Sequence, residues 1–191
     1  MTHDLREKGY WSSEHCFSAE LVRNLYVLAQ SWEQNGRFSA AKIGRGDTKS
    51  REETIRGDST CWVDDFTEHS LAEYHGAMVE MTQRVRQECY LPVRNLEAHF
   101  AIFPENSFYS RHRDRHQTVH GEQAPRLLTC VLYLSPWKAG CGGELLLHPE
   151  TASSIEIRPL QGNFVIFDSE MEHEVTKTLV PRWSLTAWLR G

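Results

Sequence analysis

The sequence predicts an α+β fold in which two helices precede a β-rich half. Two segments before residue 96 carry apolar residues at helical spacing, and short β-branched and aromatic runs separated by turn residues follow. The length of 191 residues suits one domain with a single large core. We therefore expect one domain over residues 1–191, with helical support and a mobile loop in 1–95 and a β core in 96–191.

The two predicted helices lie within residues 18–36 and 65–90. Ser18 can cap the first helix, and Asn35-Gly36 can end it. Apolar residues at three- and four-residue spacing give each helix one buried face. These residues are Leu21, Leu25, Leu28 and Trp32 in the first helix, and Leu71, Tyr74, Met78, Met81 and Val85 in the second.

A long polar segment, residues 44–63 ("GRGDTKSREETIRGDSTCWV"), separates the predicted helices. Loops of this length inside a compact domain are usually functional or disordered. The segment holds two "RGD" triplets, which would suggest adhesion in a secreted protein. Because the start of the chain lacks the layout of a secretory signal, we treat the triplets as chance and expect a functional loop.

The β-rich half consists of short runs at regular spacing, which is typical of a sandwich or a barrel-like roll. Helices on one side of such a β core give an α+β arrangement. The runs are "LEAHFAIF" (96–103), "RLLTCVLYL" (126–134), "GELLLH" (143–148), "SIEIRPL" (154–160), "NFVIF" (163–167), "HEVTKTL" (173–179) and "RWSLTAWL" (182–189).

Composition excludes several classes of protein. The formal net charge of −5 argues against a general nucleic-acid binder. The five cysteines form no CxxC pair, which argues against a zinc ribbon or a disulfide framework. No apolar run approaches the roughly 20 residues that a membrane-spanning helix needs. We therefore expect a cytoplasmic protein with no membrane or nucleic-acid partner.

The stretch "YSRHRDRHQ" (109–117) concentrates residues that could carry chemistry. Its "HRD" triplet resembles a kinase catalytic loop, but position 119 is Val where a kinase needs Asn, and no DFG motif is present. A helical zinc site would use His112 and His116, yet the segment has no amphipathic stripe and no Glu at position 113. A mixed His/Asp metal site is the interpretation that survives.

In an extended strand, residues two apart point to the same face, so His112 and Asp114 would project together. Two ligands bind a metal poorly, and the candidate third is His173, in "DSEMEHEV". Two histidines and one carboxylate on one face, with open positions, form the typical site of a non-haem iron(II) oxygenase. Any one of the ten histidines is more often structural than a ligand, so the prediction depends on the combination.

Arg182 follows His173 by nine residues and begins an otherwise apolar strand. A buried arginine is costly unless it meets an anion, and its planar fork suits a carboxylate. Thr186 shares its face by strand parity and could add a hydroxyl donor. Iron at one end of a pocket and arginine at the other suit a dicarboxylic acid that chelates metal through a keto-acid end, which describes 2-oxoglutarate.

In this order, HxD, His and Arg resemble the Fe(II)- and 2-oxoglutarate-dependent dioxygenases, whose fold is a double-stranded β-helix of jelly-roll or cupin-like type. Several stretches resemble more closely the prolyl 4-hydroxylases of the hypoxia-inducible-factor type and their bacterial relatives. The resemblance runs from about residue 40 to the C-terminus. Its motifs are "IGRGDTKSREETIRGDSTCWV", "FYSRHRD", "LTCVLYLSPW", "GGELLL", "GNFVIFDSEMEHEV" and "RWSLTAW".

Position by position, the resemblance implies His112, Asp114 and His173 as iron ligands, with Arg182 binding the distal carboxylate of 2-oxoglutarate. It implies further cosubstrate contacts and two substrate-binding residues in a mobile loop. Where the family commonly has a tyrosine near the cosubstrate, this chain has a phenylalanine. The implied cosubstrate residues are Tyr133, Thr186, Leu145, Trp188 and Phe103, and the implied substrate residues are Arg56 and Asp58.

The resemblance also implies an activity, the hydroxylation of a prolyl residue in a protein with release of succinate and CO2. The cofactors would be Fe(II), 2-oxoglutarate and O2, with ascorbate as a candidate reductant. A component of the translation machinery is one candidate substrate. Two alternatives stay open, the same chemistry on a small molecule or another side chain, and a non-redox cupin-like metal-binding module.

Overall fold

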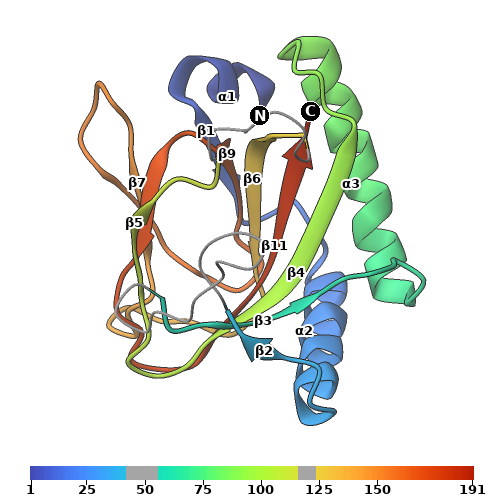
Figure 1. The fold of residues 1–191 in the computed structure, drawn as a ribbon, viewed down its shortest axis with the longest axis vertical. Coiled ribbons are helices and arrows are strands. Elements are labelled where there is room, and N and C mark those ends of the chain that lie inside the picture. The colour runs from blue at the N-terminus through green and yellow to red at the C-terminus, as the bar shows by residue number, and fades with distance from the viewer. Residues whose placement is uncertain (42–55, 116–123) are drawn as a thin grey trace.

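Two antiparallel β-sheets face each other, and two long helices cover the outer face of the larger sheet (Figure 1). The computed structural model describes residues 1–41, 56–115 and 124–191. Both termini lie at the same end of the molecule, at the top of Figure 1. This arrangement confirms the predicted α+β class with a double-stranded β-helix core.

The described strands form one larger and one smaller sheet. The larger has the order β1-β9-β6-β11-β4-β3-β2, and the smaller has the order β5-β10-β7-β8. In the larger sheet the strands are β1 (Tyr10–Ser13), β9 (Phe164–Asp168), β6 (Arg126–Tyr133), β11 (Arg182–Arg190), β4 (Asn95–Phe103), β3 (Ser59–Trp62) and β2 (Ser39–Ala40). In the smaller sheet they are β5 (Tyr109–His112), β10 (Glu172–Val175), β7 (Leu145–His148) and β8 (Ile155–Ile157).

The predicted helices form where their capping and apolar patterns place them. Helix α2 (Ala19–Gln34) begins after Ser18, whose side chain accepts a hydrogen bond from the backbone N–H of Leu21. Helix α3 (His69–Glu88) buries all five apolar residues of its predicted stripe. In α2, Leu28 is only half-buried, and Val22 and Ala29 lie in the core instead.

Strand alternation divides the apolar interior into two cores. The outward face of the larger sheet packs against α2 and α3, for example through Phe100 and Leu185. The inward face meets the smaller sheet, for example through Ala101, Tyr133 and Leu147. The inward face also carries the polar side chains of the candidate site, so the barrel between the two sheets is where chemistry can occur.

The first 95 residues contribute more to the sheet than the sequence predicted. Helix α1 (Thr2–Lys8) and strand β1 were not predicted, and β1 pairs with β9 at the edge of the larger sheet. Residues 59–62, expected to be loop, form β3 and pair with β4. The remainder of the predicted 44–63 loop up to residue 55 lies outside the described residues.

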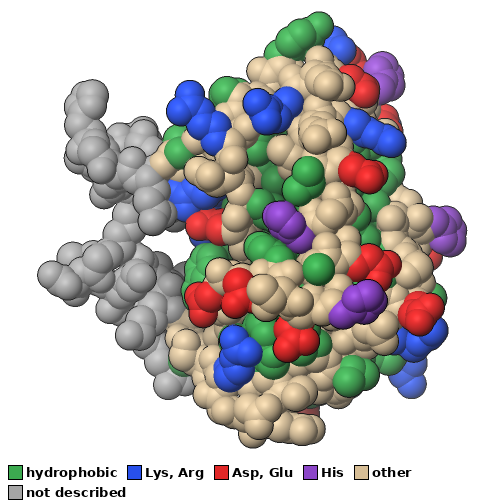
Figure 2. Space-filling model, turned by 90° about the vertical axis from the view of Figure 1, so that its right-hand side faces the viewer, with side chains coloured by type: hydrophobic (Ala, Val, Ile, Leu, Met, Phe, Trp, Pro, Cys, Tyr) green, Lys and Arg blue, Asp and Glu red, His purple; other side chains and the backbone are tan. Residues whose placement is uncertain are grey.

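On the face covered by the helices, acidic and basic side chains are interspersed (Figure 2). In the part of the chain that the structure describes, no helix is long and apolar enough to cross a membrane. All five cysteines are free thiols.

Met78→Ala should lower the free energy of unfolding by about 2–5 kcal/mol, because Met78 is fully buried between α3 and the larger sheet. Val79→Ala on the same helix is the matched control, since Val79 is 41% exposed and such a change is worth about 0.5 kcal/mol or less. Urea denaturation followed by circular dichroism measures both. Equal effects of the two substitutions would contradict the packing described for α3.

Candidate active site

His112, Asp114 and His173 come together at one end of the barrel between the sheets. Each offers one ligand atom, and these three atoms all lie within 4.8 Å of one another. His112 Nε2 lies 3.5 Å from Asp114 Oδ1, and His173 Nε2 lies 3.6 Å from Asp114 Oδ2. Two imidazole nitrogens and one carboxylate that converge in this way form a donor set that can hold a divalent transition metal.

Backbone pairing brings the two histidines together. Strands β5 and β10 run antiparallel, and His173 is paired with His112 in their register. Asp114 does not lie in a strand, because β5 ends at His112. The prediction that His112 and Asp114 share a face through strand parity is therefore wrong in its cause. Asp114 is instead placed by its backbone N–H, which donates to the carbonyl of Ser169 at 3.1 Å.

Both imidazoles are oriented by the backbone. The Nδ1 atom of His112 lies 2.8 Å from the carbonyl oxygen of Ser110, and that of His173 lies 2.9 Å from the carbonyl oxygen of Met171. A carbonyl oxygen only accepts, so each Nδ1 carries the proton and donates. In the neutral form of a ring held in this way, the lone pair is on Nε2, which faces Asp114 in both residues. Burial lowers the pKa of His173 to about 4, which keeps this ring neutral near pH 7.

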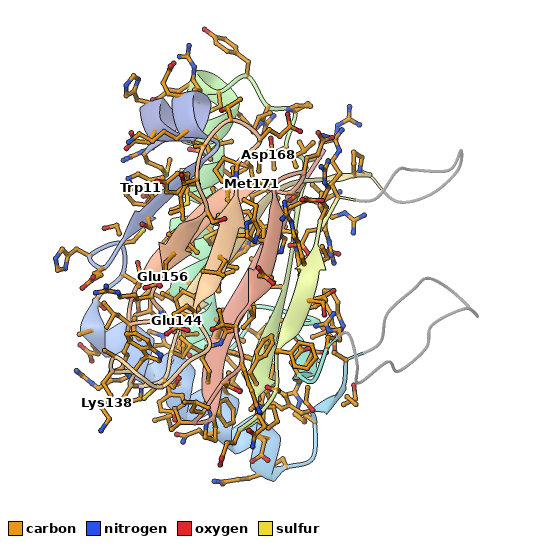
Figure 3. All side chains as sticks on the ribbon, turned by 90° about the vertical axis from the view of Figure 1, so that its left-hand side faces the viewer. Trp11, Lys138, Glu144, Glu156, Asp168 and Met171 are labelled. Atoms are coloured by element: carbon orange, nitrogen blue, oxygen red, sulfur yellow. The ribbon has the colours of Figure 1, made fainter. Side chains whose placement is uncertain are left out.

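The turn that carries Met171 connects β9 to β10. The Met171 backbone N–H donates to the carbonyl of Asp168 at 2.9 Å, and the two residues lie close together in Figure 3. Ser169 in the same turn accepts backbone hydrogen bonds from both Asp114 and Arg115. One tight turn therefore positions two of the three converging residues.

The Asp114 carboxylate is held by donors from the larger sheet. Its Oδ2 atom accepts hydrogen bonds from Thr129 Oγ1 at 2.8 Å and Trp188 Nε1 at 2.9 Å. Burial by itself would raise the pKa of Asp114. The neighbouring His173 and His112 and the more distant Arg126 outweigh it and hold the pKa well below its usual range. Asp114 is therefore a carboxylate and not an acid at neutral pH.

The three arginines of the "RHRDR" stretch form ion pairs across the turn and do not enter the barrel. Arg111 and Arg113 both pair with Glu172, and Arg115 pairs with Glu170 at 2.9 Å. Glu172 directly precedes His173 in the sequence. These pairs link the segment that holds His112 and Asp114 to the strand that holds His173.

Arg182 lies at the opposite end of the inner face and is 4% exposed. Its Nη1 donates to the carbonyl of Gly143 at 3.0 Å, and its guanidinium lies 4.3 Å from the ring centroid of Phe103. Among the described residues, no carboxylate lies within ion-pair distance of it. Burial lowers the pKa of Arg182, which still leaves it charged at neutral pH. A buried guanidinium without a counter-ion is a site for an anionic ligand.

Three buried polar atoms near this end have no hydrogen-bond partner in the described residues. They are Arg182 Nε, the Tyr133 hydroxyl and the Ser184 hydroxyl. Buried polar groups are nearly always satisfied, so orphans that share one face indicate a ligand with oxygen acceptors. This donor set fits the distal carboxylate of 2-oxoglutarate. Ser184 was missed from the sequence, although its position two residues after Arg182 on β11 places it on the same face.

The other predicted cosubstrate residues line the space between the sheets, Phe103, Thr186 and Trp188 from the larger sheet and Leu145 from the smaller one. Phe103 and Leu145 are buried in the inner core, and Phe103 offers only a ring where a phenol would donate. Thr186 lies on β11 between Arg182 and Trp188 and is half-buried. Trp188 is buried and contacts Asp114 directly.

The predicted substrate residues Arg56 and Asp58 pair with each other. Arg56 Nε donates to Asp58 Oδ1 at 2.7 Å and Arg56 Nη2 donates to Asp58 Oδ2 at 2.5 Å. The guanidinium of Arg56 also lies 4.4 Å from the ring centroid of Tyr109, which stacks on His112 at 3.6 Å. The pair therefore lies at the rim of the barrel and packs against Tyr109, which in turn contacts His112.

Three other histidines, His116, His120 and His148, lie near these motifs in the sequence. His148 lies on β7, where its ring contacts Ser154 at 2.8 Å and Glu174 at 3.0 Å. It is not part of the converging group. His116 and His120 lie outside the described residues.

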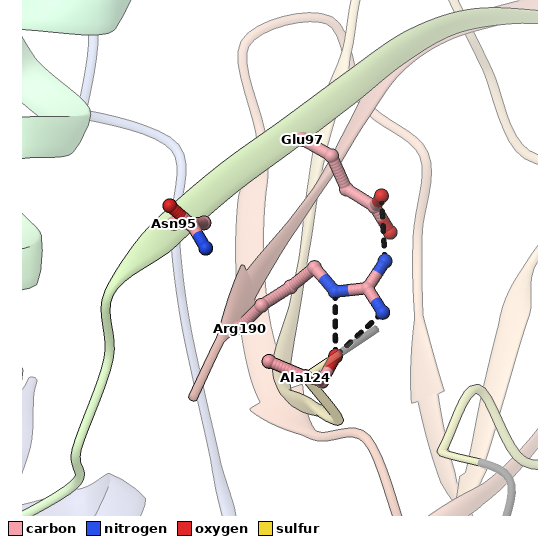
Figure 4. A pocket seen from close by; sticks show the side chains of 4 residues that line it. All are labelled: Asn95, Glu97, Ala124 and Arg190. Carbon is pink, nitrogen blue, oxygen red and sulfur yellow. Dashed lines mark hydrogen bonds and ion pairs between the residues drawn. The ribbon is translucent and has the colours of Figure 1, made fainter. Parts of the chain in front are cut away.

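A cavity of about 340 Å³ lies beside the site (Figure 4). Glu97 in its wall accepts hydrogen bonds from Arg126 and Arg190, each at 2.8 Å. The Arg126 guanidinium also lies 3.5 Å from the ring centroid of Trp188, so the side chains of Arg126 and Trp188 connect this wall to Asp114. The residues lining the cavity are Asn95, Glu97, Ala124 and Arg190.

The metal-free protein should lose stability as the pH falls from 6.5 towards 4. Burial lowers the pKa of His173 to about 4 and that of His99 on β4 to about 3, both from 6.5. Below pH 6.5 the unfolded chain binds protons that the folded chain does not, which favours unfolding by about 1.4 kcal/mol per pH unit for each group. Urea denaturation with a chelator at several pH values measures the slope. A stability that is flat over this range would contradict the burial of neutral rings.

Comparison with known proteins agrees with this geometry. Residues 98–190 match the family model of the 2OG-Fe(II) oxygenase superfamily. A prolyl-4-hydroxylase structure from Pseudomonas putida superimposes with a TM-score of 0.89 at 32% identity, covering 100% of this chain and 97% of that one. No curated protein matches the chain significantly in sequence.

Two further structures share the fold at lower identity. A prolyl hydroxylase from Trichoplax adhaerens, in complex with a peptide fragment of the hypoxia-inducible-factor oxygen degradation domain, gives a TM-score of 0.85 at 22% identity and covers 99% of this chain and 86% of that one. The α-ketoglutarate-dependent epimerase SnoN of nogalamycin biosynthesis gives 0.69 at 12% identity, covering 98% and 79%. The match to the family model and the 32% identity to the Pseudomonas structure over nearly its whole length show that the chain belongs to the 2OG-Fe(II) oxygenase superfamily and is a 2-oxoglutarate-dependent dioxygenase.

Proposed function

We propose that this enzyme hydroxylates a prolyl residue of a protein, using Fe(II), 2-oxoglutarate and O2 and releasing succinate and CO2. The observation that carries the chemistry is one inner face with three converging metal donors at one end and the buried, uncompensated Arg182 at the other. The prolyl target is supported by 32% identity to a bacterial prolyl-4-hydroxylase along nearly its whole length.

In this proposal His112, Asp114 and His173 hold the iron. The donors are two neutral imidazole nitrogens and one carboxylate, the set that non-haem iron(II) oxygenases use while leaving positions open. Each imidazole is oriented by a hydrogen bond from its other nitrogen, which is the usual outer support of a metal ligand. Trp188 and Thr129 give the carboxylate the same support.

In the same proposal Arg182 binds the distal carboxylate of 2-oxoglutarate, with Tyr133 and Ser184 as further donors. The orphaned atoms of all three lie on the inner face, where water is largely excluded. Gly143 makes room for the guanidinium, because a Cβ at this position would lie 3.2 Å from Arg182 Cδ and 2.9 Å from Thr178 Cγ2. A charged hydrogen bond in so dry a site is stronger than the same bond in water.

Bound iron and O2 would supply the oxidising chemistry, with 2-oxoglutarate as the two-electron co-reductant, and the protein's own residues bind, orient and shield. Arg182 fixes one end of the cosubstrate and so sets the position of the other. Phe103 and Leu145 keep water from the space between the two sheets, which we call the inner chamber. Rigid strands carry most of these groups, which suits a reaction in which the reacting atoms must be held close together.

A protein substrate would approach at the rim beside Trp188. Trp62 on β3 is 46% exposed, although its ring packs 5.9 Å from that of Trp188. The Arg56–Asp58 pair lies next to Tyr109, which stacks on His112. An exposed aromatic ring beside a dry chamber suits the stacking of a prolyl ring. We propose Arg56 and Asp58 as the substrate-binding pair of the rim, in which Arg56 contacts the substrate and the buried Asp58 orients it.

The finer identity of the substrate and reductant also belongs to this proposal. A cytoplasmic component of the translation machinery is our candidate substrate, and ascorbate is our candidate reductant. The alternative of a non-redox metal-binding module does not account for Arg182, which such a module does not need. Incubation with a cell lysate distinguishes the alternative of a small-molecule substrate from a protein substrate.

His173→Ala should weaken Fe(II) binding by more than about 100-fold, because removal of even an outer partner of a metal ligand costs about 10–100-fold. His148→Ala is the matched control, a histidine of the adjacent strand β7 that is hydrogen-bonded to Glu174. Anaerobic equilibrium dialysis measures both affinities. We expect alanine at His148, His116 or His120 to leave iron binding intact. Retained iron binding in His173→Ala would show that the ligand set is wrong.

Incubation of a cell lysate with active enzyme should add one oxygen to proline in one or a few proteins. Asp114→Ala is the control, and it should form no succinate while keeping its circular dichroism spectrum. Peptide mass spectrometry identifies the modified residue, and succinate release gives the stoichiometry. Oxygen gained only by small molecules, or only by side chains other than proline, would exclude the prolyl proposal while leaving the iron and 2-oxoglutarate assignment in place.

A further inference from the structure

His99 is a buried histidine that the proposed reaction does not yet use. It lies on β4 with Ala101 and Phe103 on the inward face, and it is 6% exposed. Its Nδ1 atom has no hydrogen-bond partner in the described residues. Of the orphaned atoms on the inner face, it is the one nearest the metal donors, whereas the others surround Arg182.

The surroundings of His99 place it beside the metal end of the chamber. Its ring centroid lies 5.0 Å from that of Trp188, and Trp188 donates directly to Asp114. Its cross-strand partners are Thr186 on β11 and Trp62 on β3. A ligand that extends from Arg182 to the metal donors must pass the level of Thr186 and therefore the level of His99.

The ring is neutral at neutral pH and can donate only one hydrogen bond. Burial lowers the pKa of His99 to about 3. The charged groups that act on it oppose one another, since Asp58 and Asp114 raise the pKa while Arg56 and Arg126 lower it. His99 therefore does not supply charge to the chamber, and its contribution is an N–H group or a lone pair in a fixed position.

Packing alone does not account for a histidine at this position. Between Trp62 and Trp188, a leucine or phenylalanine would fill the space without burying an unpaired nitrogen. An unpaired buried polar atom destabilises the ligand-free fold. A cost of this kind is typical of a group whose partner arrives with the ligand.

We propose that the Nδ1–H of His99 donates a hydrogen bond to the oxo-acid end of 2-oxoglutarate and so positions the cosubstrate at its metal end. This inference rests on the proposed function. Arg182 and its neighbours then bind the distal carboxylate, and His99 binds an oxygen of the other end. His99 is a positioning residue in this account, because it orients the cosubstrate and does not take part in bond formation.

The experiment compares His99→Leu, which removes the donor, with His99→Asn, whose amide nitrogen can replace Nδ1. Mn(II) stands in for Fe(II) in air, and calorimetry gives the dissociation constants of Mn(II) and then of 2-oxoglutarate. We expect His99→Leu to bind Mn(II) normally and 2-oxoglutarate about tenfold more weakly. His99→Asn should recover much of that loss. The melting temperature of ligand-free His99→Leu should be unchanged or higher, because an unpaired nitrogen has been removed.

A spectroscopic measurement distinguishes effects at the oxo-acid end of the cosubstrate from effects at its distal carboxylate. Anaerobic Fe(II) with 2-oxoglutarate gives a charge-transfer absorption band that depends on the chelating oxo-acid end. His99→Leu should shift this band. Arg182→Gln, in which affinity is lost at the distal end, should leave the band of the saturated complex in place.

The outcomes that overturn the inference are distinct from those that overturn the proposed function. An affinity of His99→Leu within twofold of wild type, with an unshifted band, would show that His99 does not contact the cosubstrate. A ligand-free melting temperature several degrees lower, with weaker Mn(II) binding, would show a structural role only. If the wild-type protein itself fails to bind 2-oxoglutarate with Mn(II), the proposed function fails and this inference fails with it.

Discussion

The placement of one carboxylate, Asp114, constrains the rest of this structure. A buried carboxylate is costly unless donors and positive or polar groups surround it. Here Thr129 and Trp188 supply donors from the larger sheet, while His112 and His173 approach from the smaller one. The two sheets must therefore close on each other at this point. Strand register, the β9–β10 turn and the arginine–glutamate pairs all serve to bring both sets of groups to the same carboxylate.

The inner chamber contains groups that favour ligand binding and that lower the stability of the ligand-free fold. Its walls are packed apolar side chains, yet it keeps several polar atoms unpaired, and Arg182 has no counter-ion within ion-pair distance among the described residues. In a protein selected for stability alone, apolar groups of the same volume would replace them. They lie on one face between Arg182 and His99, where a ligand with acceptors at both ends can pair with them. Binding of that ligand then stabilises the fold by satisfying these groups.

Patterns local in sequence predicted much of this architecture, and contacts between distant segments account for what was missed. The α3 stripe and the alternation within β11 depend on periodicity alone, so both could be derived. Strand β1 could not, because four residues near the N-terminus become a strand only by pairing with β9. Asp114 was expected on the correct side for the wrong reason, since a turn far away in the sequence, at Ser169, positions it. His99 gave no signal, because an isolated histidine in an apolar strand usually packs as a core residue.

The Arg56–Asp58 pair connects the rim of the barrel to His112, one of the three converging residues. Arg56 packs over Tyr109, and Tyr109 stacks nearly parallel on His112, with 16° between the ring planes. Any displacement of Arg56 therefore acts on a ring that touches His112, a proposed iron ligand. Asp58 opposes such displacement, because its buried carboxylate would lose the partner that satisfies it. The pair thus both shapes the rim and supports the ring that stacks on His112. Under the proposed function, substitutions there should affect substrate binding and iron binding together.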